Sequence, residues 1–491
     1  MRRIRSIAYA ALALVCVAAA QKQPEFTKVF SRQEFAQRRE KLAAAIGKNA
    51  IAVVRGREDL PNYVSYRENN ELFYLTGTEA PGSILLVDGA SGRSVLFMPA
   101  REERRQKFEG ALLAPDDISR QIAGVDIRPL DQFAGALAMM ARDHDTLYSP
   151  TAPQEVEATS RDLAVRYNLD RMNDPWDGQA SREARFIARM QERFPAFAIR
   201  DLTPALDHMR LIKSPQEIVL MRRSSELASL ALAEGMRSTM PGQYEYELGA
   251  LMRFIHRRNG AQGEAYYPLV ATGANAYAPH YHAASSQLKD GDLLLLDSAP
   301  DYHYYMSDVT RMWPVNGRFS QPQRELYSFY LGCYRAIIAH IRPNASPRLI
   351  GQEAGRDMEA LLQRTKFTNP LHAKAAAKFV SDYKTRAEGA GPYMLGHWVG
   401  MSTHDVGGAV DTLKPGMIFT IEPALTVPED ETYIRIEDML LVTDTGVEVM
   451  SPQAPEDPDA IEKLMKENGI LKQSPRPLPD DAVNLSVAPH M

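Results

Sequence analysis

The chain has 491 residues and a formal net charge of −5, from 57 Lys and Arg against 62 Asp and Glu. This length predicts two or more domains, and 45% hydrophobic with 24% charged residues is the composition of an ordinary globular protein. The nearly balanced charge gives no reason to expect nucleic acid as a partner.

The N-terminus has the pattern of a secretory signal peptide. Residues 1–5 are basic, Ile7 to Val17 are apolar, and small residues lead to the expected cleavage after Ala20. The apolar run is too short to span a membrane, so we expect no stable membrane anchor and a periplasmic or secreted protein. Removal of residues 1–20 would leave Cys333 as the single cysteine, which excludes an intramolecular disulfide.

Residues 21–205 are expected to form an α/β domain, because strand-like apolar runs alternate with helical patterns. We predict helices at Ser31–Ala45, Arg101–Gly110, Leu130–Met140 and Arg182–Arg193, and strands at Ala50–Val54, Leu72–Leu75, Ser83–Val87, Val95–Pro99 and Thr146–Tyr148. This region has no phosphate-binding loop, cysteine cluster or catalytic constellation in its sequence.

Residues 206–465 show one pattern twice, in which helices precede an apolar hairpin that carries carboxylates. A capping box with proline at the first helical position begins the region at Ser214. We predict helices that follow Ser214, that span Tyr244–Arg258, that run from Ser320 to Ile341 and from Ser346 to Leu362, and that span Ala373–Tyr383. Such a duplication would bring both hairpins to one site. Residues 466–491 are polar and rich in proline and are expected to form a mobile tail.

The first hairpin is predicted to hold two facing carboxylates. Four consecutive leucines between Asp292 and Asp297 are typical of a buried strand, and the chain then turns back towards Asp308. Closing the hairpin between Tyr302 and His303 would place Asp297 directly opposite Asp308. Facing carboxylates repel each other, so a buried pair needs a shared proton or a cation.

The second hairpin repeats this arrangement. An apolar strand ends at Glu422, and closing the turn between Glu429 and Asp430 would place Glu422 opposite Glu437. His397 lies between the two hairpins in the sequence. For a single pair, strand-end carboxylates in water would be the better interpretation. Two pairs with one imidazole instead favour two bridged divalent cations.

The segment from about 210 to 450 resembles the pita-bread metallopeptidases, in the branch of aminopeptidase P and prolidase. The segments that carry this resemblance are Val270–Ala276, Pro279–Tyr281, Asp290–Asp297, Ser307–Gly317, His397–Gly400, His404–Gly407, Thr420–Pro423 and Arg435–Asp438. The N-terminal region resembles the companion domain of aminopeptidase P, most clearly over Tyr66–Gly77. The resemblance implies an α/β domain followed by an α+β pita-bread domain with an internal pseudo-two-fold duplication.

The resemblance also implies roles for single residues. The metal ligands that it implies are Asp297, Asp308, His397, Glu422 and Glu437. They would hold two divalent ions, with Mn²⁺ as the family's usual metal and Co²⁺, Zn²⁺ or Fe²⁺ as alternatives. Glu422 would also act as general acid and base, and Arg435 would hold a ligating carboxylate. His404 would bind the substrate carbonyl, and His280 would lie beside the leaving proline. A homo-oligomer, dimer or tetramer, is implied as well.

Three positions depart from the family pattern. Tyr393 stands where a histidine is common four residues before His397, and Thr426 and Thr403 replace a tyrosine and an aliphatic residue. Tyrosine can donate a hydrogen bond but cannot take up a proton near neutral pH. We predict an Xaa-Pro aminopeptidase, which releases the first residue of peptides with proline in second position. The alternatives are a prolidase, which cuts only Xaa-Pro dipeptides, and a weakly active peptide-binding homologue, which Tyr393 would favour.

Overall fold

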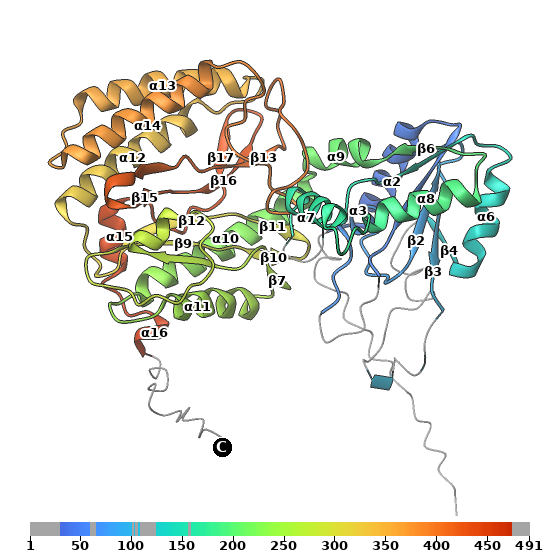
Figure 1. Cartoon of the computed structure of the whole chain (residues 1–491), viewed down its shortest axis with the longest axis horizontal. Coiled ribbons are helices and arrows are strands. Elements are labelled where there is room, and N and C mark those ends of the chain that lie inside the picture. The colour runs from blue at the N-terminus through green and yellow to red at the C-terminus, as the bar shows by residue number, and fades with distance from the viewer. Residues whose placement is uncertain are drawn as a thin grey trace, which may run out of the picture.

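The computed structural model describes residues 30–473, except for 59–64, 101–102, 104–106, 109–123 and 156–158. The predicted signal peptide, most of the helix predicted at 101–110 and the end of the chain lie outside the described residues. Two lobes are visible, an N-terminal lobe around one sheet and a second lobe in which long helices cover small sheets (Figure 1). No helix in the described part of the chain is both long and apolar enough to cross a membrane.

The N-terminal lobe contains a six-stranded mixed sheet in the order β4-β3-β2-β1-β5-β6. Its strands are β1 (Ala50–Arg55), β2 (Ile84–Asp88), β3 (Ser94–Met98), β4 (Val125–Pro129), β5 (Thr146–Ser149) and β6 (Ala198–Asp201). Its helices are α2 (Arg32–Ile46), α3 (Asn70–Thr76), α6 (Phe133–Met140), α7 (Arg161–Asn173) and α8 (Arg182–Arg193). Alternate residues of β1 enter two cores: Ala52 and Val54 pack with α2 and α3, and Ile51 and Val53 pack with α6 and α8. The expected α/β domain is therefore confirmed.

One element of this lobe differs from its prediction. Leu72–Leu75 lies in helix α3 and not in a strand. The side chain of Asn69 accepts a hydrogen bond from the backbone N–H of Leu72 at 2.8 Å, and Gly77, with φ of 65°, ends the helix. Every residue of α3 is buried, so no polar face marks it as helical in the sequence. The prediction of a strand was wrong because an apolar run of this length fits either element.

The second lobe holds two three-stranded antiparallel sheets, β12-β9-β8 and β13-β16-β17. Their strands are β8 (Leu269–Thr272), β9 (Leu293–Asp297), β12 (Thr310–Pro314), β13 (Ile418–Ile421), β16 (Asp438–Val442) and β17 (Val447–Val449). Short strands complete the lobe at β7 (Gly263–Glu264), β10 (Pro300–Tyr302), β11 (Tyr305–Met306), β14 (Leu425–Val427) and β15 (Thr432–Ile434). An isolated bridge between Thr310 and Glu437 joins the two sheets.

Long helices precede each of these sheets in the chain. They are α10 (Pro215–Ser238), α11 (Glu245–Arg258), α12 (Gln321–His340), α13 (Pro347–Arg364) and α14 (Pro370–Glu388). In Figure 1, α12 to α14 lie on one side of the sheets and α10 and α11 on the other. The predicted duplication, with two carboxylate hairpins brought together, is therefore confirmed. Cys333 of α12 is fully buried in the core of this lobe.

The register of the second hairpin is as predicted, and that of the first differs by two positions. Leu425 pairs with Ile434, a register that places Glu422 opposite Glu437. In the first hairpin, Asp297 pairs with Thr310 and not with Asp308. The reason is the turn, because His303 and Tyr304 both have positive φ (53° and 73°) and form a two-residue connection between Tyr302 and Tyr305. Asp308 lies two residues before Thr310 and so stays diagonal to Asp297 on the same face.

Described helices lie across or beyond both boundaries expected for the second lobe. The boundary at 205/206 falls inside α9 (Thr203–Leu211), where Leu206 is buried in a core that both lobes share. The described structure also continues past 465, through α15 (Pro458–Leu464) and α16 (Ile470–Gln473). Glu467 pairs with Arg237 at 2.8 Å and the Leu471 N–H bonds the Ser238 hydroxyl at 3.2 Å, so residues 466–473 pack on α10.

Candidate metal centre

The residues that the sequence predicts as metal ligands come from the ends of strands that meet in the middle of the second lobe. Asp297 ends β9, Asp308 stands two residues before β12, Glu422 follows β13, and Glu437 precedes β16. His397 lies in the loop before β13, where the adjacent Trp398 forms a bridge to Phe419. All five side chains line one cavity of about 200 Å³, together with His280, His404 and Arg435.

The ligand atoms form overlapping groups rather than one isolated cluster. Asp297, Asp308 and Glu437 bring three carboxylate oxygens within 4.8 Å of one another. His397, Glu422 and Glu437 form a second such group, and Glu437 belongs to both. Two neighbouring groups that share a carboxylate are the arrangement needed to bridge two divalent cations with hard oxygen ligands.

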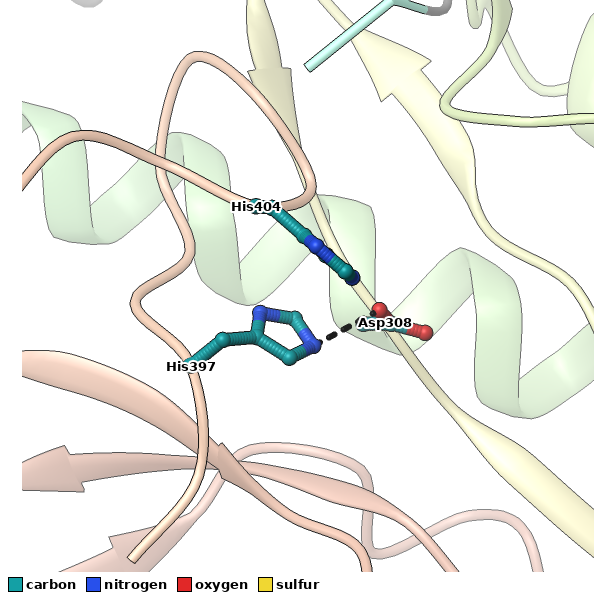
Figure 2. Close-up of side chains that lie close together, drawn as sticks. All are labelled: Asp308, His397 and His404. Atoms are coloured by element: carbon teal, nitrogen blue, oxygen red, sulfur yellow. Dashed lines mark ion pairs between the residues drawn. The ribbon is translucent and has the colours of Figure 1, made fainter. Parts of the chain in front are cut away.

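His397 is oriented so that one ring nitrogen faces the carboxylates. Its Nδ1 lies 3.2 Å from the backbone carbonyl of Trp398, which accepts a hydrogen bond and thereby places the proton on Nδ1. Its Nε2 lies 3.3 Å from Glu422 and 3.4 Å from Asp308. Figure 2 shows His397 and His404 approaching Asp308 from two parts of the same loop region.

A buried oxygen without a donor supports a cation here. Glu437 is almost fully buried, and its Oε2 accepts a hydrogen bond from the Thr310 hydroxyl at 2.8 Å. Its Oε1 accepts no hydrogen bond from the described residues and lies 3.7 Å from Nε2 of His397. Buried polar atoms are nearly always satisfied, and a divalent cation between the carboxylates would satisfy this one. The residues present therefore fit a pair of metal ions.

The pKa values of the clustered side chains, without any ion, also favour a cation site. Burial raises the pKa of Asp308 well above its usual range, and the charges of Glu437 and Asp297 raise it further. Burial, with Glu437 as the next cause, raises the pKa of Glu422 to about 7. Burial alone would lower the pKa of His397, but the nearby carboxylates of Asp308 and Glu437 outweigh it and hold that pKa well above the usual range. Without cations, the cluster keeps protons that the cations would displace.

Comparison with known proteins agrees with this geometry. Residues 219–444 match the model for metallopeptidase family M24, and residues 35–148 match the model for the aminopeptidase P N-terminal domain. Xaa-Pro aminopeptidase of Escherichia coli (strain K12) is 30% identical over 462 residues, which cover 89% of this chain and 98% of that protein. This chain belongs to the aminopeptidase P family of M24 metallopeptidases.

Solved structures of the family superpose on the chain. Aminopeptidase P from E. coli with the inhibitor Pro-Leu has a TM-score of 0.71 and 27% identity, and the match covers 89% of this chain and 98% of the other. Zn-substituted E. coli aminopeptidase P in complex with product matches with the same values. The expected order of an α/β domain and a pita-bread domain is the order found in this aminopeptidase P chain.

Two further side chains in this aminopeptidase P site hold the candidate ligands in place. Arg435 bonds Asp297 through Nη2, and its Nη1 lies 3.5 Å from Glu422. Tyr266, which the sequence analysis missed, donates its hydroxyl hydrogen to Asp297 or Asp308, and its oxygen lies 2.7 Å from Asp308 Oδ1. Burial, followed by the two aspartates, raises the pKa of Tyr266 well above its usual range, so it remains a donor. No pattern in the sequence around Tyr266 distinguishes it from a core residue.

The remaining predicted residues take different positions in this aminopeptidase P chain. His404 and His280 line the cavity, and His280 is exposed. Thr403 is buried in the cavity wall. Tyr393 does not line it, because its ring lies over Gly351 of α13 and 5.4 Å from the guanidinium of Arg348. The family's histidine at this position therefore has no counterpart in the cavity, because Tyr393 does not reach it.

The N-terminal lobe also contributes to the cavity, which the sequence did not predict. Ser160, Asp162 and Leu163, at the start of α7, form part of its wall. Sequence analysis did not predict α7 at all, because its apolar residues do not follow a single helical face. Leu163, Tyr167 and Leu169 are all exposed, and Ala164 is its one buried residue.

Proposed function

We propose that this chain is a two-metal Xaa-Pro aminopeptidase, which releases the first residue of a peptide when proline follows. The observation that carries the proposal is the single cavity in which five candidate metal ligands lie beside His404 and His280. The relatives named Xaa-Pro aminopeptidase and the complexes with Pro-Leu and with product support it. The bond to proline is a tertiary amide with a constrained ring, which explains the need for a dedicated site.

The side chains of the cavity have distinct tasks in this reaction. Two bound cations would lower the pKa of a water molecule and polarise the scissile carbonyl. Glu422 is more exposed than Asp297 and can move a proton between water and the leaving nitrogen. Arg435 holds Glu422 and Asp297 in place. His404 would donate to the carbonyl oxygen as charge develops there, and His280 at the cavity wall would contact the proline side.

We favour Mn²⁺ as the metal, because four of the five ligands are hard carboxylates. Zinc is an alternative, since one solved structure of the E. coli relative is of a Zn-substituted form. Metal analysis of the purified protein tests both the identity and the number of ions. Two ions per chain are expected.

Hydrolysis of an Xaa-Pro-Xaa tripeptide and of an Xaa-Pro dipeptide by the mature chain with added Mn²⁺ tests the activity. We expect release of the first residue from the tripeptide, and loss of that activity in Glu422→Gln, which keeps the shape of the side chain without its charge. Cleavage of the dipeptide alone would instead establish a prolidase. No cleavage of either peptide by a folded, metal-loaded protein would favour the peptide-binding homologue.

We also propose that the protein is exported and acts in the periplasm or outside the cell, on the basis of the signal-like pattern of residues 1–20. N-terminal sequencing of the protein from its native source should then begin at Gln21. A homo-oligomer, dimer or tetramer, is proposed by family resemblance, and light scattering of the purified chain measures it. A mature protein that retains Met1 would contradict the export proposal.

A further inference from the structure

Helix α7 lies in a part of the chain that neither family model covers, since the two matches end at 148 and begin at 219. Figure 1 shows α7 between the two lobes. Its N-cap Ser160 and its first-turn residues Asp162 and Leu163 nevertheless line the candidate metal-binding cavity. Roles carried over from the matched segments therefore do not explain these residues.

Buried ion pairs fix the start of α7. Arg161 bonds Glu155 at 2.7 Å and Glu71 at 2.6 Å. Glu155 is fully buried and also accepts a hydrogen bond from the Ser402 hydroxyl at 2.6 Å. Ser402 stands two residues before His404, so α7 and the His404 loop are attached to the same carboxylate.

The other side of His404 is held by the same group of charges. Asp405 pairs with Arg210 at 2.6 Å and with Lys213 at 3.2 Å, and all three are buried. Arg210 in turn lies 3.2 Å from Glu155. The residues that flank His404 are thus fixed relative to the first turn of α7, and the distance between that turn and His404 is set by buried, charge-assisted hydrogen bonds.

Asp162 is oriented towards His404 within this framework. Its Oδ1 accepts a hydrogen bond from the Ser160 hydroxyl at 2.6 Å. Its Oδ2 lies 3.3 Å from Nδ1 of His404. The ring of His404 extends from there towards Asp308 (Figure 2). The carboxylate therefore contacts the ring nitrogen that is remote from the metal ligands.

We propose that Asp162 is a positioning residue for His404. A carboxylate on Nδ1 keeps a proton on that nitrogen and fixes the orientation of the ring, so that Nε2 faces the cavity. Nε2 donates a hydrogen bond to the substrate oxygen when it also carries a proton, which requires the imidazolium form of the ring. Asp162 makes no contact with the substrate in this role, and its effect passes entirely through His404. The inference deepens the proposed function, on which its kinetic consequences rest.

A double-mutant cycle tests this coupling. Asp162→Ala should lower kcat for the tripeptide by about tenfold with a smaller change in KM, and Asp162→Asn, which can still accept the hydrogen bond, should recover part of that loss. In a His404→Ala background, Asp162→Ala should have no further effect. Asp170→Ala, the same change at an exposed position of α7, is the matched control and should leave kcat unchanged.

A second measurement does not depend on turnover. In metal-free protein labelled with ¹⁵N-histidine, the His404 signals, assigned by their loss in His404→Ala, should show a proton on Nδ1. Asp162→Ala should shift them towards a mixture of tautomers, and Asp170→Ala should not. Unchanged signals in Asp162→Ala, or an equal loss of activity in the His404→Ala background, would overturn the proposal. Wild-type protein with the expected signals but no peptidase activity would overturn only the proposed function.

Discussion

At the scale of single residues, the carboxylates depend on neighbours that are not ligands. Tyr266 contacts Asp297 and Asp308, and Arg435 contacts Asp297 and Glu422. One donor therefore connects the two aspartates of the first hairpin, and the other connects the two hairpins. These contacts fix the directions of the ligand oxygens before any ion binds, which is the usual task of groups around a metal site.

Replacing Tyr266 by phenylalanine should weaken metal binding while leaving the fold intact. The change removes one buried hydroxyl, so Asp297 and Asp308 lose a shared donor and their orientation. We expect about a 10- to 100-fold loss of metal affinity, measured by calorimetric titration of the metal-free protein. Tyr277→Phe, at an exposed position outside the cavity, is the control. Equal affinities for the two variants would show that the hydroxyl does not organise the site.

At the scale of elements, helix α3 shows why a local pattern can mislead. Its apolar residues satisfy both a buried strand and a buried helix, and the side chain of Asn69 decides between them by capping the first turn. Asn69 can be recognised as a possible cap in the sequence. The apolar run that follows it is nevertheless short enough to form either a strand or a capped helix. The long helices α10 and α12 were predicted well because each carries proline and a capping box at its start.

Asn69→Ala should therefore destabilise the N-terminal lobe. The loss of a cap costs about 1 to 2 kcal/mol, which corresponds to a fall in Tm of roughly 4 °C for a unit of this size. Thermal unfolding measures this directly. Ser31→Ala removes the exposed cap of α2 and should cost less. If Asn69→Ala proved as mild as Ser31→Ala, the cap would not be what selects helix at this position.

At the scale of the whole molecule, the two lobes share a hydrophobic core and an aromatic contact that no single segment of the sequence predicts. The tip of the first hairpin reaches the N-terminal lobe, where the ring of Tyr304 stacks on Phe73 with centroids 3.5 Å apart. One core contains residues of both lobes, among them Leu72 and Met439. The first hairpin therefore supplies candidate metal ligands at its base and an interlobe contact at its tip.

Removal of the metals should make the stability of the whole protein depend on pH. The pKa of Glu422 is raised to about 7 in the folded, metal-free protein, above its ordinary value of 4.5. Between these values the folded state holds a proton that the unfolded state releases, so stability falls as the pH rises. The raised pKa of His397 acts in the same direction, because its contribution is present below 6.5 and is lost at higher pH.

We therefore expect Tm of the chelator-treated protein to fall by about 5 °C between pH 5.5 and pH 8. The metal-loaded protein should not show this fall, because the ions require deprotonated ligands and bind better as the pH rises. Differential scanning calorimetry at a series of pH values checks both curves. Glu422→Gln, which lacks one titrating group, should have a shallower slope in the absence of metal. Parallel slopes with and without metal would contradict this account.

In the candidate site, some residues could be predicted from the local sequence, and others could not because they are distant in the chain. The two pairs of carboxylates could be predicted because each lies at the end of a short apolar strand, and the register of the second hairpin followed from its turn. The register of the first hairpin was predicted wrongly because His303 and Tyr304 adopt left-handed backbone conformations, which neither residue type favours. Tyr266 and Asp162 could not be predicted, because only the tertiary fold brings them to the cavity.

Cys333 is buried in α12, and burial raises the pKa of its thiol to about 12. At ordinary pH it therefore carries almost no thiolate, and thiol-reactive reagents should leave it untouched. A chain that starts after residue 20 has no other cysteine and so provides a ready background for site-directed labelling. A spin label on a single new cysteine in the exposed part of α7 would report its distance to a paramagnetic Mn²⁺ without any change to the native sequence elsewhere.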